Sequence, residues 1–123
     1  MKKLVEALLE NLSTREVFLF RIACAVCGES FGNQPIRFTK AGENADTETK
    51  QTLWKALYEE ELRSVRQTAI MQASEHMNFC PICKQLVCNQ CFMICDELDM
   101  CKDCAKELQQ KGQPVSSVVI TES

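Results

Sequence analysis

The sequence predicts a small α+β domain whose fold depends on bound metal. With 123 residues, the chain can bury only a modest hydrophobic core. Eight of its nine cysteines fall into four Cys-x-x-Cys pairs, a density that points to cross-linking by metal or disulfides. Between the first and second pairs, a run from about 47 to 77 contains neither glycine nor proline and favours one long helix. These observations together predict helices and short strands built around metal-binding cysteines.

The first expected element is a short amphipathic helix over residues 2–12, within an N-terminal segment 1–16. Its apolar residues recur at helical spacing: Leu4, Val5, Leu8, Leu9 and Leu12. This stripe either packs on the rest of the chain or forms the contact of a homodimer. Because Glu6 and Glu10 interrupt the apolar run, we expect no export signal here.

Residues 17–112 are expected to form the metal-dependent domain. The run "VFLFRIAC" favours a strand over 17–23, and "TKAGENADTE" has the composition of an exposed loop. The inserted helix, at about 47–77, follows this loop and repeats apolar residues three or four positions apart. Trp54 and Tyr58 belong to that repeat, so we expect both to pack in the core.

The C-terminal segment "CKDCAKELQQKGQPV" predicts a short helix that runs to about Lys111. Gly112 is placed to cap this helix and Pro114 to stop it. We expect a flexible tail at 113–123, although "VVI" is able to add an edge strand.

The cysteine pairs carry the strongest functional pattern in the sequence. They are Cys24 and Cys27, Cys80 and Cys83, Cys88 and Cys91, and Cys101 and Cys104. A two-residue spacing lets a tight turn direct both sulfurs to one ion, and zinc takes four such thiolates tetrahedrally. The pairs therefore predict two closed Cys₄ sites that hold two Zn²⁺, with no coordination position left for water. Three ways of combining four pairs remain open at this point.

A resemblance to a known zinc finger distinguishes among these combinations. The knuckle "CPIC", a hairpin that residues 84–95 are able to form, and a helix opened by Cys101 and Cys104 resemble a treble-clef or zinc-ribbon arrangement. In a treble clef, the knuckle and the helix share one metal. The resemblance therefore implies one site of Cys80, Cys83, Cys101 and Cys104 and a second of Cys24, Cys27, Cys88 and Cys91, an interleaved cross-brace. A competing sequential scheme joins the first two pairs in one site and the last two in the other.

The order of the pairs is also similar to the cross-brace of FYVE-type zinc fingers, through "KQLV" after Cys83 and the opening "CAVCGESF". That family carries an Arg- and His-rich cluster before its second pair, which binds a phosphoinositide head group. This chain has "ASEHMNFC" there, so the resemblance implies the geometry without the lipid ligand. The ending "CPxC…VCxxC…CxxCA" resembles small bacterial zinc-ribbon proteins of uncharacterised function, and that resemblance supplies no activity.

Composition and charge argue against several classes of function. The formal net charge is −3; eight thiolates and two Zn²⁺ bring it to about −7, which disfavours general binding to nucleic-acid phosphates. No run approaches the roughly 18 to 20 apolar residues that a membrane span requires. Retained thiols are typical of a reducing compartment, so the expected location is the cytoplasm.

Three residues near the cysteine pairs have competing interpretations. Cys95, the ninth cysteine, is either a substitute ligand, a redox-sensitive thiol or a buried free cysteine, of which the last is simplest. His76 is able to ligate zinc, but with every site filled by cysteine a helix-end histidine is the simpler interpretation. Phe79, directly before the knuckle, is expected to pack.

The sequence contains no catalytic constellation: it has one histidine, and no Gly-rich phosphate loop or serine-nucleophile motif. We therefore expect a non-enzymatic, structural zinc-binding protein that acts as a protein–protein interaction or adaptor module. A zinc–thiolate redox sensor is the second hypothesis, and a nucleic-acid-binding zinc ribbon is the third. The sequence does not name the partner.

Overall fold

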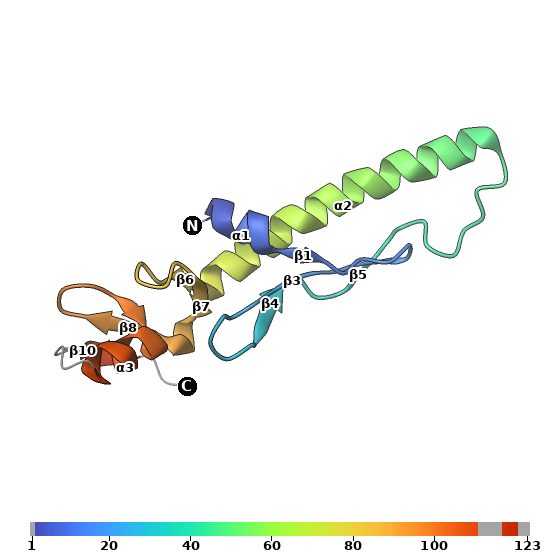
Figure 1. The fold of residues 1–123 in the computed structure, drawn as a ribbon. Coiled ribbons are helices and arrows are strands. Elements are labelled where there is room, and N and C mark those ends of the chain that lie inside the picture. Colours follow the sequence, from blue (N-terminus) through green and yellow to red (C-terminus); the bar gives the residue numbers. More distant parts are fainter. Residues whose placement is uncertain (1, 111–116, 121–123) are drawn as a thin grey trace. The chain divides into compact units, whose positions relative to one another are not determined.

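The computed structural model alternates helices with short antiparallel strands, and it describes residues 2–110 and 117–120 (Figure 1). The helices are α1 (Lys2–Leu8), α2 (Glu48–His76) and α3 (Lys102–Gln110), with a short 3₁₀ helix η1 (Asn89–Cys91). The strands are β1 (Glu10–Asn11), β2 (Val17–Phe18), β3 (Phe20–Ala23), β4 (Ser30–Gly32), β5 (Ile36–Arg37), β6 (Met77–Phe79), β7 (Leu86–Cys88), β8 (Phe92–Cys95), β9 (Met100–Cys101) and β10 (Ser117–Ile120). The α+β class and the long helix, expected at about 47–77, are confirmed.

The described residues divide into two compact units. The helical unit contains residues 2–22 and 31–73, and thus most of α2. The cysteine unit contains residues 23–30 and the described residues from Ser74 onward. Because 23–30 belongs to the cysteine unit, the first cysteine pair lies in the same unit as the other three.

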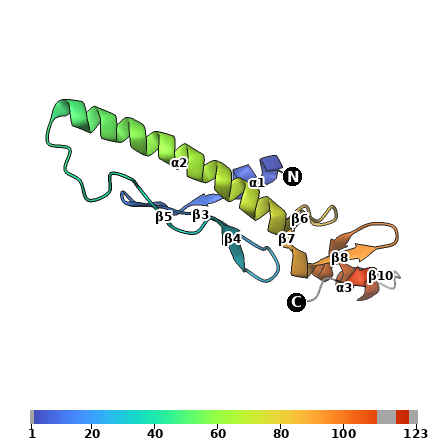
Figure 2. The same cartoon turned by 180° about the vertical axis from the view of Figure 1, so that it is seen from behind.

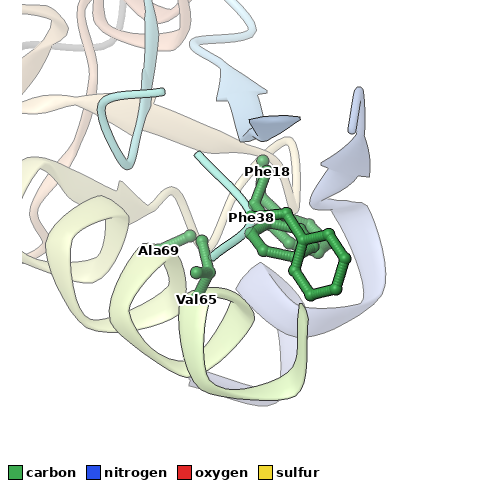
Figure 3. Close-up of a cluster of buried hydrophobic side chains, with 5 residues drawn as sticks. Phe18, Phe38, Val65 and Ala69 are labelled. Atoms are coloured by element: carbon green, nitrogen blue, oxygen red, sulfur yellow. The ribbon is translucent and has the colours of Figure 1, made fainter. Parts of the chain in front are cut away.

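The helical unit has a hydrophobic core between α2 and the phenylalanines of the N-terminal strands. Its buried members are Phe18, Phe20, Phe38, Val65 and Ala69. Figure 3 shows Phe18 and Phe38 facing Val65 and Ala69 on α2. The Tyr58 ring centroid lies 5.0 Å from that of Phe18 and 5.4 Å from that of Phe38, as the helical spacing predicted. Packing of this apolar face against the phenylalanines holds α2 in place, although few residues near its N-terminal end are buried.

The strand expected at 17–23 is present as β2 and β3, with a break at Leu19. Strand β2 pairs with β5, whereas β3 lies between β1 and β4. The buried side chain of Asn33 fixes the break, because its Oδ1 accepts a 2.8 Å hydrogen bond from the Phe20 N–H and its Nδ2 donates to the Phe18 carbonyl at 3.1 Å. A single amide thus replaces the ladder hydrogen bonds that the break removes.

The N-terminal helix is shorter than the sequence predicted, since α1 ends at Leu8 and residues 10 and 11 form β1. Local hydrogen bonds explain the difference: Asn11 Oδ1 accepts the Ser13 N–H at 3.0 Å, and the Leu12 N–H donates to the Leu19 carbonyl at 2.8 Å. An Asn side chain that caps its own backbone competes with helix continuation.

Helix α1 lies beside α2 in both views of the helical unit (Figure 1, Figure 2). The Arg66 guanidinium donates to the Glu6 carbonyl at 3.2 Å, which ties the two helices together. Val5 is fully buried, while Leu8 and Leu12 are each 50% exposed. The apolar stripe of the N-terminal segment is therefore only partly covered within this chain.

The cysteine unit contains two hairpins in place of the single hairpin expected at 84–95. Strand β6 pairs with β7, and β8 pairs with β9. The prediction was wrong because the chain reverses at the "CPIC" knuckle itself, where the Lys84 N–H donates to the Cys80 carbonyl at 2.8 Å. Strand β7 therefore returns to pair with the residues before the knuckle.

Helix α3 follows β9 directly, and its described residues end at Gln110. Lys111, Gly112 and Pro114, which the sequence placed at the end of this helix, lie outside the described residues. Strand β10 pairs antiparallel with β8, so the edge strand allowed by "VVI" is present within the segment expected as a tail. The division of the chain at 1–16, 17–112 and 113–123 stays a prediction. Among the described helices, none combines the length and apolar character needed to cross a membrane.

Candidate metal centres

All eight paired cysteines gather into two groups of four in the cysteine unit. The first group is Cys24, Cys27, Cys88 and Cys91, and the second is Cys80, Cys83, Cys101 and Cys104. Within each group, the four Sγ atoms lie within 4.8 Å of one another. This grouping is that of the interleaved scheme, and it differs from the sequential scheme that the sequence left open.

The separations between sulfurs match the edges of a coordination tetrahedron. In the first group, the Cys27 and Cys88 sulfurs are 3.7 Å apart and those of Cys88 and Cys91 are 3.6 Å apart. In the second group, the Cys80–Cys104 and Cys83–Cys101 separations are 3.8 and 3.9 Å. Four thiolates at about 2.3 Å from one zinc ion are about 3.8 Å from each other. A disulfide needs about 2.05 Å, and none of the nine cysteines forms one.

The first two cysteines of each group lie on a knuckle, and the two knuckles have the same hydrogen bonds. The Cys24 N–H donates to the Glu29 carbonyl at 2.8 Å, and the Cys80 N–H donates to the Gln85 carbonyl at 2.9 Å. The residue after each second cysteine donates back to the first cysteine, at 3.0 Å from Gly28 and 2.8 Å from Lys84. The two knuckles are thus local copies of one turn, although their sequences share little beyond the cysteines.

This turn needs a left-handed backbone at its fifth position. Gly28 adopts φ +79° there without cost, whereas Lys84 adopts φ +62° and is the one non-glycine residue with positive φ in the described chain. The second knuckle therefore holds backbone strain that the first lacks.

The other two cysteines of each group lie where a strand runs into a helix. Cys88 ends β7 and Cys91 lies in η1, while Cys101 ends β9 and Cys104 lies in the first turn of α3. Backbone N–H groups at the start of a helix favour nearby thiolates. Each candidate centre therefore combines a knuckle with the beginning of a helix.

Backbone N–H groups donate to the first knuckle sulfur in both groups. Cys24 Sγ accepts from the N–H of Cys88 at 3.2 Å and of Val26 at 3.4 Å, and Cys80 Sγ accepts from the N–H of Cys101 at 3.4 Å. The bonds from Cys88 and Cys101 cross from one cysteine pair to the other, so they help to set the position of the two pairs. They also spread the charge of a thiolate.

The pKa values follow from burial and from these donors. Burial raises the pKa of the Cys24 thiol, but the backbone N–H groups of Cys27, Cys88 and Val26 outweigh it and lower the pKa to about 7. Burial and backbone donors act in the same opposing way on Cys80, and its pKa falls to about 6. Among the six cysteines whose pKa shifts, these two are therefore the ones that ionise most readily, one in each group.

The remaining shifts run in the opposite direction. Burial raises the pKa of four thiols, with neighbouring sulfurs as further causes: Cys88, Cys91, Cys101 and Cys104. Four clustered thiols cannot all ionise, because each new thiolate faces the charge of the others in a partly dehydrated site. A bound cation removes this conflict and allows all four to act as ligands. The electrostatics of each group therefore fit a cationic occupant.

The two groups also share one pattern of exposure. Cys27 and Cys83, the second cysteines of the two knuckles, are exposed, whereas the other three members of each group are buried. A soft thiolate donor set in tetrahedral geometry is typical of Zn²⁺ or iron. The residues present thus fit a single metal ion in each group.

The structure places the remaining candidates outside both groups. Cys95 is half-buried in β8, and its N–H donates to Asp99 Oδ1 at 3.0 Å. His76 is exposed at the end of α2. Phe79 was expected to pack, but it is 37% exposed because it ends β6 directly before the knuckle turns away.

A cavity of about 430 Å³ lies in the helical unit, beside the aromatic side chains of Phe38 and Trp54. Trp54, expected in the core, is half-buried and has the Lys40 ammonium 5.2 Å from its ring centroid. The other charged side chains of the lining are Arg15, Glu16 and Glu43. No cysteine, histidine or hydroxyl side chain lines it.

Comparisons of this chain with protein-family models, with curated proteins and with solved structures give no match. Inference about function therefore depends on the two cysteine groups. Sequence spacing identified all their members, but it did not reveal the exposure of Cys27 and Cys83 or the strain at Lys84. The strain at Lys84 could have been predicted from the sequence, since "CAVCG" has glycine at the fifth position of the turn and "CPICK" has lysine there.

Proposed function

We propose that this chain is a structural zinc-binding protein that holds two Zn²⁺ in closed Cys₄ centres and has no enzymatic activity. The observation that carries the proposal is the set of sulfur separations, 3.6 to 3.9 Å, in both groups. A single ion surrounded by four thiolates requires these separations. All four positions around each ion are then filled by protein, which leaves none for a reacting water.

The treble-clef resemblance is part of the same proposal for the second centre. Cys80 and Cys83 come from a knuckle that ends a β6–β7 hairpin, and Cys101 and Cys104 come from the start of α3. A knuckle and a helix start are the two sources of ligands in a treble clef. The first centre departs from that pattern, since η1 is a single short turn of three residues.

We further propose that the zinc centres hold a surface for a protein partner in the cytoplasm. The cysteine unit exposes four large apolar side chains, between 37% and 47% of their surface: Phe79, Ile82, Ile94 and Leu98. Apolar side chains of this kind favour a protein partner over nucleic acid, and the net charge of −3 supports the same choice. A homodimer through α1 is the second form of partner, supported by the half-exposed Leu8.

Metal analysis of freshly purified, reduced protein tests the zinc centres. The expected result is two zinc ions per chain, and the double variant Cys101→Ser/Cys104→Ser should retain one. Cys95→Ser is the matched control, because it changes a cysteine outside both groups and should retain two. Absence of bound metal refutes the proposal, whereas iron in place of zinc would assign electron transfer to the same ligands.

Capture of partners by the zinc-loaded chain tests the proposed surface. Phe79→Ser/Ile82→Ser should lose the captured protein while it keeps two zinc ions, since neither side chain is a candidate ligand. Leu53→Ser/Leu57→Ser, on exposed positions of α2, is the control that should retain it. A partner that is lost only with the α2 variant would move the surface to the helical unit.

A further inference from the structure

We propose that Cys27 and Cys83 are the sites at which hydroperoxides oxidise this protein, and that each then forms a disulfide with a cysteine of the other pair in its own centre. The inference rests on the proposed zinc centres and adds a modification chemistry to them. It assigns the products as Cys27–Cys88 and Cys83–Cys101 disulfides.

Access to the sulfur selects the residue that reacts first. Cys27 and Cys83 are exposed, whereas their six partners in the two groups are buried. Oxidation of cysteine requires both thiolate character and solvent access. Coordination to zinc keeps all eight sulfurs as thiolates, so access is the property in which these two differ from the rest.

A sulfur of the other cysteine pair lies close to each exposed cysteine and indicates the second cysteine of each disulfide. Cys27 Sγ lies 3.7 Å from Cys88 Sγ, and Cys83 Sγ lies 3.9 Å from Cys101 Sγ. Both contacts join the knuckle to the other pair of the same centre. The competing second cysteine is the first residue of the knuckle itself, Cys24 or Cys80.

Hydrogen bonding disfavours that competitor. Cys24 Sγ accepts hydrogen bonds from the backbone N–H groups of Cys88 and Val26. In the second centre, Cys80 Sγ accepts a hydrogen bond from the Cys101 N–H. Donated hydrogen bonds withdraw charge from sulfur and reduce its nucleophilicity. These hydrogen bonds disfavour Cys24 and Cys80 as the second cysteine of the disulfide.

The chemistry has two steps in each centre. The thiolate of Cys27 attacks the outer oxygen of the hydroperoxide, an S–O bond forms, the O–O bond breaks, and an alkoxide or hydroxide leaves. The thiolate of Cys88 then attacks the resulting sulfenic acid, an S–S bond forms, and hydroxide leaves. Two sulfurs lose two electrons in total, and one peroxide is reduced. The disulfide removes two of the four thiolates that would hold the zinc ion, so a bound ion would be released.

Cys95 is the natural competitor for the oxidant because it belongs to neither centre. It is half-buried, however, and its sulfur lies 3.9 Å from the Met93 carbonyl on the same strand. We therefore expect Cys95 to react after the two exposed zinc thiolates.

The test uses the full zinc-loaded chain, after metal analysis has established its zinc content. Limited hydrogen peroxide is followed by alkylation, trypsin digestion and mass spectrometry. Trypsin places Cys27 in peptide 22–37, Cys83 in 67–84, and both Cys88 and Cys101 in 85–102. The proposed disulfides join all three peptides into one species. Disulfides within the knuckles leave the three peptides separate.

We expect about two equivalents of peroxide per chain to release both zinc ions and to yield the joined species. Brief treatment with limiting iodoacetamide should place most label on Cys27 and Cys83, in wild type and in Cys95→Ser alike. The inference is overturned if a chain with two zinc ions is first labelled on Cys95 or yields only disulfides within the knuckles. A chain without zinc overturns the proposed function instead, so the two failures are distinguishable.

Discussion

Removal of zinc should unfold the cysteine unit and leave the helical unit folded. The two units have different cores: six of the twelve buried hydrophobic residues of the cysteine unit are cysteines of the two groups, whereas the helical unit buries none. The apolar remainder in the cysteine unit is Met77, Leu86, Val87, Phe92, Met100 and Ala105. A unit of 49 described residues with so small an apolar core lies in the range where small domains need metals or other cross-links.

The size of the effect follows from the metal and from the helices. A structural zinc contributes about 10–16 kcal/mol in zinc-finger peptides at neutral pH, which is comparable to the whole stability of a typical domain, about 5–15 kcal/mol. The described α-helices contain 7, 29 and 9 residues, and the cysteine unit holds α3 and the last three residues of α2. Unfolding that unit therefore removes about a quarter of the helical signal.

Circular dichroism and hydrogen exchange during titration with a zinc chelator measure this change under reducing conditions. We expect amides at 77–110 to lose protection as zinc is removed, while those around Val65 and Ala69 keep theirs because the phenylalanine core remains. Addition of zinc should restore the signal. Retained protection at 77–110 in the metal-free chain would refute the dependence on zinc, and loss of more than half the helical signal would refute the independence of the helical unit.

Backbone geometry supplies the remaining predictions. Lys84→Gly should raise the free energy of unfolding of the zinc-loaded chain by about 1 kcal/mol, because glycine adopts the left-handed backbone at φ +62° without strain. Gly28→Ala should lower the same free energy by a similar amount, because it introduces that strain at φ +79°. Urea denaturation at fixed free zinc measures both, and equal stability of Lys84→Gly and wild type would contradict the strain. Gly32→Ala should lower the stability of the helical unit by about 3 kcal/mol or more, because its Cβ would overlap the Phe20 carbonyl; a soluble variant with wild-type stability excludes that close approach. Asn33→Ala should lower the stability of the helical unit by about 2 kcal/mol, because the substitution leaves the Phe20 N–H unpaired. Metal analysis should still find two zinc ions in this variant. Loss of zinc would show that the break in the strands supports the cysteine unit.

Local patterns predicted the helices and the ligands because each depends on neighbours in the sequence. The helix at Glu48–His76 follows from a run free of glycine and proline, and each cysteine pair follows from a spacing of three. The prediction of a hairpin at 84–95 was wrong because the chain already reverses at the knuckle, where the Lys84 N–H closes the turn. The helix expected at 2–12 was too long because pairing of Glu10 with Arg21 depends on a strand ten residues away.

The sequence by itself determined the kind of chemistry: eight thiolates in pairs, each pair spaced so that one turn can direct both sulfurs to an ion. Tertiary structure decided which pairs meet, because sulfurs 61 residues apart, in Cys27 and Cys88, are brought to 3.7 Å by hydrogen bonds between the two segments. It also decided that one cysteine of each centre is exposed. Both properties depend on contacts between distant segments, which the spacing of residues along one chain does not encode.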